Sequence, residues 1–198
     1  MAQWQLIERD VRDKLGEGTL WSARDNAVYW TDIIAPAFNR LSLTDGSIAR
    51  WVMPEPIGWI AERQGGGFIA GLQSGFARLS LDPLVLDPFG DPERHLPGNR
   101  MNDGKADAEG RIWCGTMDME EKEDSGAFYR LDPDGRWTQM DSGYHVPNGP
   151  AFRYAETGFI TPILPAARSI AFAVPTAAVF RVGRSSSSSA MAMAIPMA

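Results

Sequence analysis

Short runs of alternating apolar and polar residues, rather than helical periodicity, characterise the chain up to about residue 150. Turns rich in Gly, Asp and Pro separate these runs roughly every ten residues. Five units show a turn followed by a strand: ARDNAVYWTD (23–32), LTDGSIARWVM (43–53), RQGGGFIAGL (63–72), DAEGRIWCGTM (107–117) and DPDGRWTQM (132–140). The pattern predicts an all-β protein.

Neighbouring strands group into three sets, near residues 17–53, 57–86 and 101–140. Four-stranded sets of about 40 residues are typical of propeller blades. A β-sandwich also has short strands that recur about every 8 to 12 residues. Periodicity therefore leaves both folds open.

The pattern changes after NGPAF (148–152), where alternation fades and alanine becomes frequent. The chain ends in GRSSSSSAMAMAIPMA, which supplies little side-chain volume to bury, so we expect disorder from Ser185 to Ala198. The sequence thus supports three strand sets and the start of a fourth, followed by an off-pattern segment over residues 153–198.

Composition narrows the classes of function. The chain has 198 residues, a hydrophobic fraction of 44%, a formal net charge of -6 and a pI near 4.9. This size allows one folded domain, or part of a larger one. We expect no nucleic-acid partner, because the chain has no global positive charge and no stripe of Lys and Arg with interleaved aromatics.

We expect neither export nor membrane insertion of this chain. The stretch MAQWQLIERDVRDK does not follow the basic, apolar and small-residue order of a signal peptide, so a cytoplasmic location is expected. The run SIAFAVPTAAVF (169–180) is shorter than the roughly 20 residues that a bilayer needs and contains Pro175. We therefore expect no membrane association.

Cysteine and histidine are too scarce for most metal and redox sites. A single cysteine, Cys114, excludes an internal disulfide, and His95 and His145 are too few for a Cys/His zinc site. Any metal would be held mainly by oxygen. Cys114 lies in an apolar strand and is expected to be a buried structural thiol, whereas both histidines are expected in loops.

The stretch NRMNDGKADAEGRIWCGTM (99–117) gathers many charges beside a predicted strand. Its turn signals at 102–104 and 107–110 explain part of this charge as solvated loop. Such loop residues are Lys105, Asp107 and Glu109. Arg100 and Asn102 are alternate residues that point to the same side of an extended segment, where they could bind a hydroxylated or carboxylated small molecule.

Two further positions allow either a structural or a binding role. Glu17 in LGEGTLW lies between Gly16 and Gly18, which permit a close backbone approach to a ligand, although a solvated turn glutamate explains the same pattern. Asn148 in NGPAF precedes a Gly-Pro turn, where its amide oxygen can either close an Asx-turn or coordinate a cation.

Taken together, LGEGTLW, NRMNDGKADAEGRIWCGTM, FYRLDPDG and VPNGPAF resemble the family of gluconolactonases, regucalcin (senescence marker protein) and luciferin-regenerating enzyme. The similarity runs from about residue 5 to residue 152. It implies a six-bladed propeller of about 300 residues with one divalent cation in its central channel. The resemblance therefore favours the propeller over the sandwich and makes residues 1–152 a partial propeller.

The resemblance also assigns roles to residues. It implies that Glu17 and Asn148 are metal ligands and that Asp103 is a supporting carboxylate. It also implies a sugar-lactone pocket lined by Arg100, Asn102 and Glu120, which Glu121 adjoins. Oxygen ligands suit calcium, magnesium or manganese, and zinc also occurs with carboxylates and water. In the implied mechanism the cation polarises the lactone carbonyl while an acidic residue removes a proton from the attacking water.

One departure from the family pattern bears on activity. The family has a Tyr-x-x-Asp-Ser-like element whose Asp is a metal ligand and the implied general base, whereas this chain has FITPIL (159–164) there and no aspartate after Asp141. A shifted codon frame through this segment permits Tyr-His-Thr-Asp-Ser. Our hypothesis is that the reading frame slipped between Phe152 and Phe159.

The sequence therefore predicts the N-terminal part of a gluconolactonase-like propeller whose metal-dependent hydrolysis of a small-molecule sugar lactone is impaired. No protein partner is inferred. The alternative is a non-catalytic calcium- or sugar-binding propeller. A propeller esterase of the arylesterase type is a third possibility, against which the Asn-Asp-Gly context at 102–104 argues.

Overall fold

The computed structural model describes residues 6–152, 158–164, 168–173 and 180–184. The regular elements in these ranges are β-strands, which confirms the all-β prediction. No helix in this part of the chain has the length and apolar character needed to cross a bilayer.

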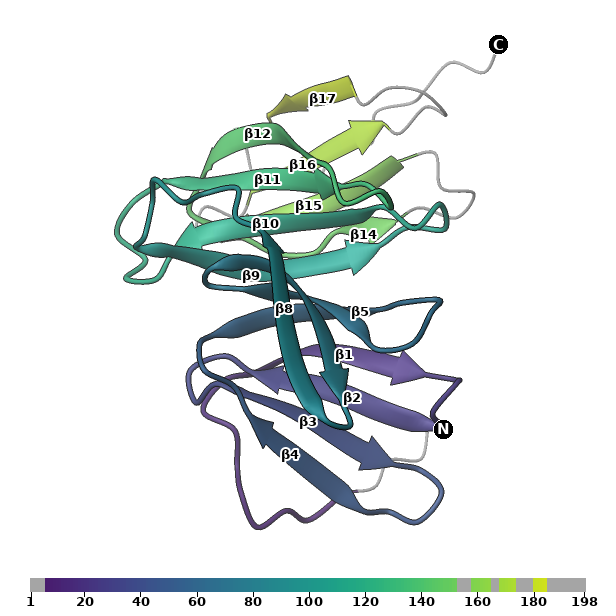
Figure 1. Cartoon of the computed structure of the whole chain (residues 1–198). Helices are drawn as coiled ribbons and strands as arrows, with labels where there is room; N and C mark the ends of the chain where they lie inside the picture. Colours follow the sequence, from purple (N-terminus) through teal and green to yellow (C-terminus); the bar gives the residue numbers. More distant parts are fainter. Residues whose placement is uncertain (1–5, 153–157, 165–167, 174–179, 185–198) are drawn as a thin grey trace.

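Three antiparallel sheets of four strands follow one another along the chain (Figure 1). The first contains β1 (Gly16–Ser22), β2 (Ala27–Asp32), β3 (Ala37–Ser42) and β4 (Ile48–Val52). The second contains β5 (Ile57–Glu62), β6 (Phe68–Leu72), β7 (Gly75–Leu81) and β8 (Leu84–Gly90). The third contains β9 (Asn99–Ala106), β10 (Ile112–Asp118), β11 (Gly126–Leu131) and β12 (Trp137–Tyr144). Each sheet coincides with one of the three predicted strand sets.

A fourth sheet follows these three. It contains β13 (Val146–Pro147), β15 (Gly158–Leu164), β16 (Arg168–Ala173) and β17 (Phe180–Arg184), and β14 (Ala151–Phe152) also pairs with β15. Pro147 pairs with Ile163, so β15 passes beside the Asn-Gly-Pro turn. The strands extend past the start of a fourth set that patterning indicated, while the disorder expected from Ser185 to Ala198 lies outside the described residues.

The hydrophobic core lies between the faces of successive sheets. Tyr29 of the first sheet and Phe68 of the second meet edge to face, with ring centroids 4.9 Å apart. Between the second and third sheets, Trp59 and Phe76 pack in one cluster with Cys114, whose predicted burial is confirmed. Such face-to-face stacking of four-stranded sheets is the packing of a propeller.

The first strands of successive sheets lie against one another, β1 with β5, β5 with β9 and β9 with β13. Gly58 permits this approach, because a Cβ added there would lie 2.5 Å from the carbonyl oxygen of Met101. Gly18 has a positive φ of 59° at a β-bulge that follows Glu17. These first strands therefore carry the side chains that face the inner side of the stack.

Two expectations for the charged stretch were wrong. Residues 102–104 form no turn but lie inside β9, because Gly104 packs against Trp59 and Cys114, where a side chain would not fit. Asp107 is not solvated, since its side chain is 3% exposed. It accepts hydrogen bonds from the backbone N–H and Nε of Arg111 and from Nε1 of Trp113.

Candidate functional site

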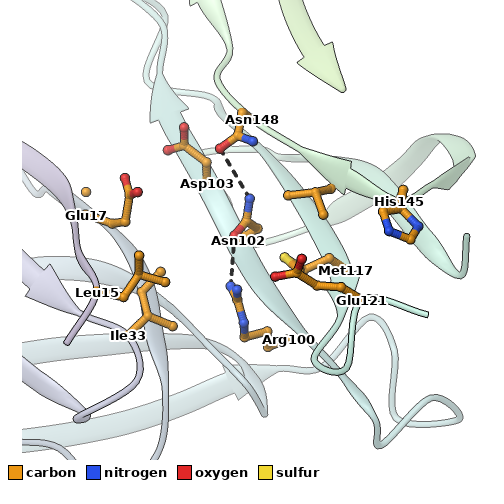
Figure 2. Close-up of a pocket in the computed structure, with 12 residues that line it drawn as sticks. Leu15, Glu17, Ile33, Arg100, Asn102, Asp103, Met117, Glu121, His145 and Asn148 are labelled. Atoms are coloured by element: carbon orange, nitrogen blue, oxygen red, sulfur yellow. Dashed lines mark hydrogen bonds between the residues drawn. The ribbon is translucent and has the colours of Figure 1, made fainter. Parts of the chain in front are cut away.

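A cavity of about 300 Å³ lies between the first and third sheets (Figure 2). Its polar lining includes Arg100, Asn102 and Asp103 of β9, Glu17 of β1, and Asn148 in the turn after β13. The structure thus brings together five of the six residues that the sequence assigned to a site. The alternation along β9 explains why Arg100 and Asn102 share this wall.

Arg100 is a buried cation at this wall, with 9% of the residue exposed. Its Nη1 donates to the carbonyl oxygen of Met101 at 3.0 Å and to Oδ1 of Asn102 at 2.9 Å. Burial lowers the pKa of Arg100, and the negative charges of Glu121 and Glu17 oppose this effect. Arg100 forms no ion pair within the described residues, so its guanidinium can serve a ligand in the cavity.

Asn102 connects Arg100 to the turn that contains Asn148. Its Nδ2 donates to the carbonyl oxygen of Pro147 at 2.7 Å and makes a longer contact of 3.5 Å with Oδ1 of Asn148. Figure 2 shows these side chains in a row along the cavity. A ligand that binds at one end of this hydrogen-bonded row would therefore change the polarisation of the side chains at the other end.

Asp103 fastens the same turn from the other side. Its two carboxylate oxygens accept hydrogen bonds from the backbone N–H groups of Gly149 and Gly104, both at 2.8 Å. Burial raises the pKa of Asp103, although these two N–H groups and the charge of Lys105 act in the opposite direction. Asp103 thus orients the backbone at Gly149, next to Asn148 and 46 residues further along the chain than Asp103.

The acidic pocket residue is Glu121 rather than Glu120. The assignment of Glu120 to the pocket is corrected, because its side chain is 69% exposed and binds Nζ of Lys122 at 2.6 Å. Glu121 lines the cavity. A turn that begins at Asp118 and gives Glu121 a positive φ of 53° causes the difference, since it directs the later glutamate to the cavity.

His145 is a lining residue that the sequence interpretation placed simply in a loop. The loop assignment is confirmed, since it lies between β12 and β13. The signal that could have identified it is its position three residues before Asn148. Leu15, Ile33 and Met117 add an apolar wall. A cavity with donors on one side and apolar groups on the other suits a small polyhydroxylated ring.

A second cavity of about 540 Å³ adjoins the first, since Glu17, Gly18 and Asp103 line both. Glu62 and Lys105 also line this second cavity. Lys105 is nevertheless exposed, as expected of a solvated lysine. The two cavities follow the inner strands β1, β5 and β9.

The predicted metal ligands, Glu17 and Asn148, line the same cavity. They offer a carboxylate and an amide oxygen, which are donors that hard cations prefer. Within the ranges that the structure describes, however, no three His, Cys, Asp or Glu side chains cluster closely enough to hold a metal. The donors fit a cation in kind, but the set is incomplete.

Stacked four-stranded sheets define a β-propeller, and a polar cavity lies along their first strands. The family described as the SMP-30/Gluconolactonase/LRE-like region matches residues 15–178. The chain belongs to this family.

Individual relatives agree with this family. The chain is 35% identical over 138 residues to 6-deoxy-6-sulfogluconolactonase of Pseudomonas putida, covering 70% of this chain and 47% of that protein. It is 29% identical over 144 residues to pentonolactonase XacC of Haloferax volcanii, covering 72% and 47% respectively. The chain thus spans about half the length of these relatives.

Solved structures agree with the fold. The structure is similar to that of the calcium-binding protein regucalcin from Agrobacterium tumefaciens, with a TM-score of 0.80, 22% identity, and coverage of 87% of this chain and 60% of that chain. This likeness confirms the predicted fold of the six-bladed propeller family.

Proposed function

We propose that the cavity binds a sugar lactone and that its chemistry is hydrolysis of the lactone ester. The observation that carries this proposal is Arg100, a buried guanidinium without an ion-pair partner in the described ranges, set beside Asn102 and Glu121 in one cavity. Its N–H groups suit a carbonyl or hydroxyl oxygen, and the carboxylate of Glu121 suits hydroxyl donors. The names of the lactonase relatives support the same substrate class.

A divalent cation is part of the proposal. Glu17 and Asn148 would hold it, and Asp103 would keep the turn that carries Asn148 in place. When bound, the cation supplies polarisation of the lactone carbonyl. Calcium, magnesium and manganese suit these oxygen donors, and zinc remains a candidate.

Weak cation binding and slow hydrolysis are expected of this chain. β15 passes beside Pro147, where the family pattern has an aspartate, yet its sequence GFITPIL contains no acidic residue. Losing a carboxylate ligand removes a negative charge from the cation site and a proton acceptor from the reaction. The impairment therefore follows from the residue types of one strand.

Hydrolysis of D-glucono-1,5-lactone, followed by acid release in a pH-stat, tests the proposal. We expect slow turnover that rises with added calcium, zinc, magnesium or manganese and falls with a chelator. Arg100→Met should abolish binding of the non-hydrolysable gluconolactam in calorimetry, whereas Arg78→Met, at an exposed position, should not. Equal binding by both variants would rule out Arg100 as the ligand-binding group.

The alternative is a non-catalytic calcium- or sugar-binding propeller. The absence of an acidic residue from β15 favours it, as does the calcium binding stated for the regucalcin structure. It predicts heat of binding for calcium or the lactam without any turnover. The two assays together therefore separate the two functions.

A further inference from the structure

His145 and Asp124 form a pair at one wall of the cavity. His145 lines the cavity, and its Nδ1 lies 2.9 Å from Oδ1 of Asp124. Asp124 is 74% exposed at the side chain, whereas the His145 side chain is 22% exposed. Figure 2 places His145 on the opposite side of the cavity from Glu17. The pair therefore lies across the cavity from Glu17, one of the two predicted cation ligands.

The contact with Asp124 determines which imidazole nitrogen can react. An ionised carboxylate only accepts hydrogen bonds, so Nδ1 of His145 must carry the proton that it donates. In the neutral imidazole, Nε2 then holds the lone pair. No described residue forms a hydrogen bond with Nε2. A histidine oriented by a carboxylate, with its second nitrogen available to a ligand, is the arrangement of a general base.

We propose that His145 is the general base for lactone hydrolysis in this chain and that Asp124 is its positioning residue. This inference rests on the proposed function of the cavity. Nε2 takes a proton from a water molecule while the water oxygen bonds to the lactone carbonyl carbon. The ring C–O bond then breaks, and the imidazolium returns the proton to the leaving ring oxygen. Lactone and water thus give the hydroxy acid without any other reactant.

Other groups in the cavity are less suited to this role. The carboxylate of Glu121 acts on the buried charge of Arg100, as does that of Glu17. Both oxygens of Asp103 accept backbone N–H groups. β15 supplies no acid. His145, in contrast, lines the cavity and is oriented by Asp124 through Nδ1. Its other nitrogen, Nε2, has no hydrogen-bond partner among the described residues.

Chemical rescue tests the proposal on the full chain. We expect His145→Ala to lower kcat for D-glucono-1,5-lactone by about 100-fold, the usual contribution of a general base. Added imidazole should restore part of this rate, because it supplies the missing lone pair. His95→Ala is the matched control, since His95 is exposed outside the cavity, and it should keep the parental rate. His145→Gln and thermal unfolding curves exclude a simple folding defect.

Asp124→Asn should also lower kcat, by a smaller factor, without changing the affinity for gluconolactam. A His145→Ala rate within about twofold of the parent, or a loss that imidazole does not restore, would overturn the proposal. Absence of turnover by the parent chain would overturn it too. Binding of gluconolactam distinguishes the two kinds of failure. If the chain still binds the lactam, the sugar-lactone site stands and only the assignment of His145 as the base is wrong. If the chain does not bind the lactam, the proposed function itself is wrong.

Discussion

Asp32 illustrates how a single buried carboxylate stabilises the connections around a sheet. Its side chain is fully buried, accepts backbone N–H groups of Leu15 and Ala35, and pairs with Nη2 of Arg50 at 3.0 Å. Burial disfavours the charge, but these donors outweigh it and hold the pKa of Asp32 below its usual 3.8. The first sheet is therefore fastened by an ionised group.

Asp32→Asn should lower the free energy of unfolding by about 2–4 kcal/mol at neutral pH, because it breaks a buried pair. A depressed folded pKa gives stability that is present above the unfolded value of 3.8 and lost as the pH falls through the folded value. The difference from the parent should therefore shrink in acid. Urea unfolding at a series of pH values measures it.

Asp87→Asn is the control for this experiment, because Asp87 pairs with Arg78 on the surface and is 61% exposed at its side chain. It should change stability by less than about 1 kcal/mol. Equal losses for the two variants would show that Asp32 has no special role.

The two adjacent glutamates give a second prediction for single residues. Glu121→Gln should weaken binding of gluconolactam by about tenfold, since a charged acceptor for sugar hydroxyls is lost. Glu120→Gln should leave the affinity unchanged, because Glu120 contacts Lys122 outside the cavity. Calorimetry on both variants decides the matter, and a loss confined to Glu120→Gln would reverse our assignment.

The cavity position of Arg100 and Asn102 could be predicted because side chains alternate along an extended strand. The position of Glu121 could not, since it depends on a positive φ in a turn whose sequence carries no glycine at that residue. Burial of Asp107 was equally hidden, because its donors Arg111 and Trp113 matter only once the hairpin forms.

Among the elements, the contact between β5 and β9 determines how close the inner strands lie. Gly58→Ala should destabilise the protein by about 1–3 kcal/mol, because the new Cβ would overlap the carbonyl oxygen of Met101. Gly65→Ala, in a loop with no atom within 4 Å of the added Cβ, should be nearly neutral. Denaturant midpoints of the two variants give the comparison, and matching midpoints would contradict close packing at Gly58.

The strand sets could be predicted from sequence because turns rich in Gly, Asp and Pro separate their strands. The same signal failed at 102–104, where an Asn-Asp-Gly triplet continues through β9. A glycine needed for close approach looks the same in sequence as a glycine needed for a turn. Only the packing of Trp59 over Gly104 distinguishes the two.

At the scale of the whole molecule, the first sheet leaves large apolar side chains exposed. Trp21 is 52% exposed and Val52 is 76% exposed. An interface of several hundred Å² at about 25 cal/mol per Å² corresponds to on the order of 10 kcal/mol, comparable to the stability of a domain. We therefore expect the 198-residue chain to be marginally stable and prone to association.

The prediction for the whole molecule concerns the reading frame of residues 153–198. We propose that they are read in a shifted frame, and that replacing them with the sequence of the other frame raises solubility, thermal stability and lactone hydrolysis together. The reason is that the replacement would supply an aspartate beside Asn148 and cover open sheet faces. Coding DNA around codons 152 to 160 is the direct check. A soluble monomer of the present chain that melts cooperatively would contradict the proposal.

The thiol of Cys114 makes separation of the second and third sheets observable. It is fully buried between them, and burial, with the nearby charges of Glu93 and Asp103, raises its pKa. A sulfhydryl reagent can therefore reach it only when these sheets part, so its labelling rate reports the opening equilibrium. We expect that rate to fall when gluconolactam binds at Arg100 and Asn102 on β9, which would convert one unreactive sulfur atom into a kinetic probe of ligand occupancy.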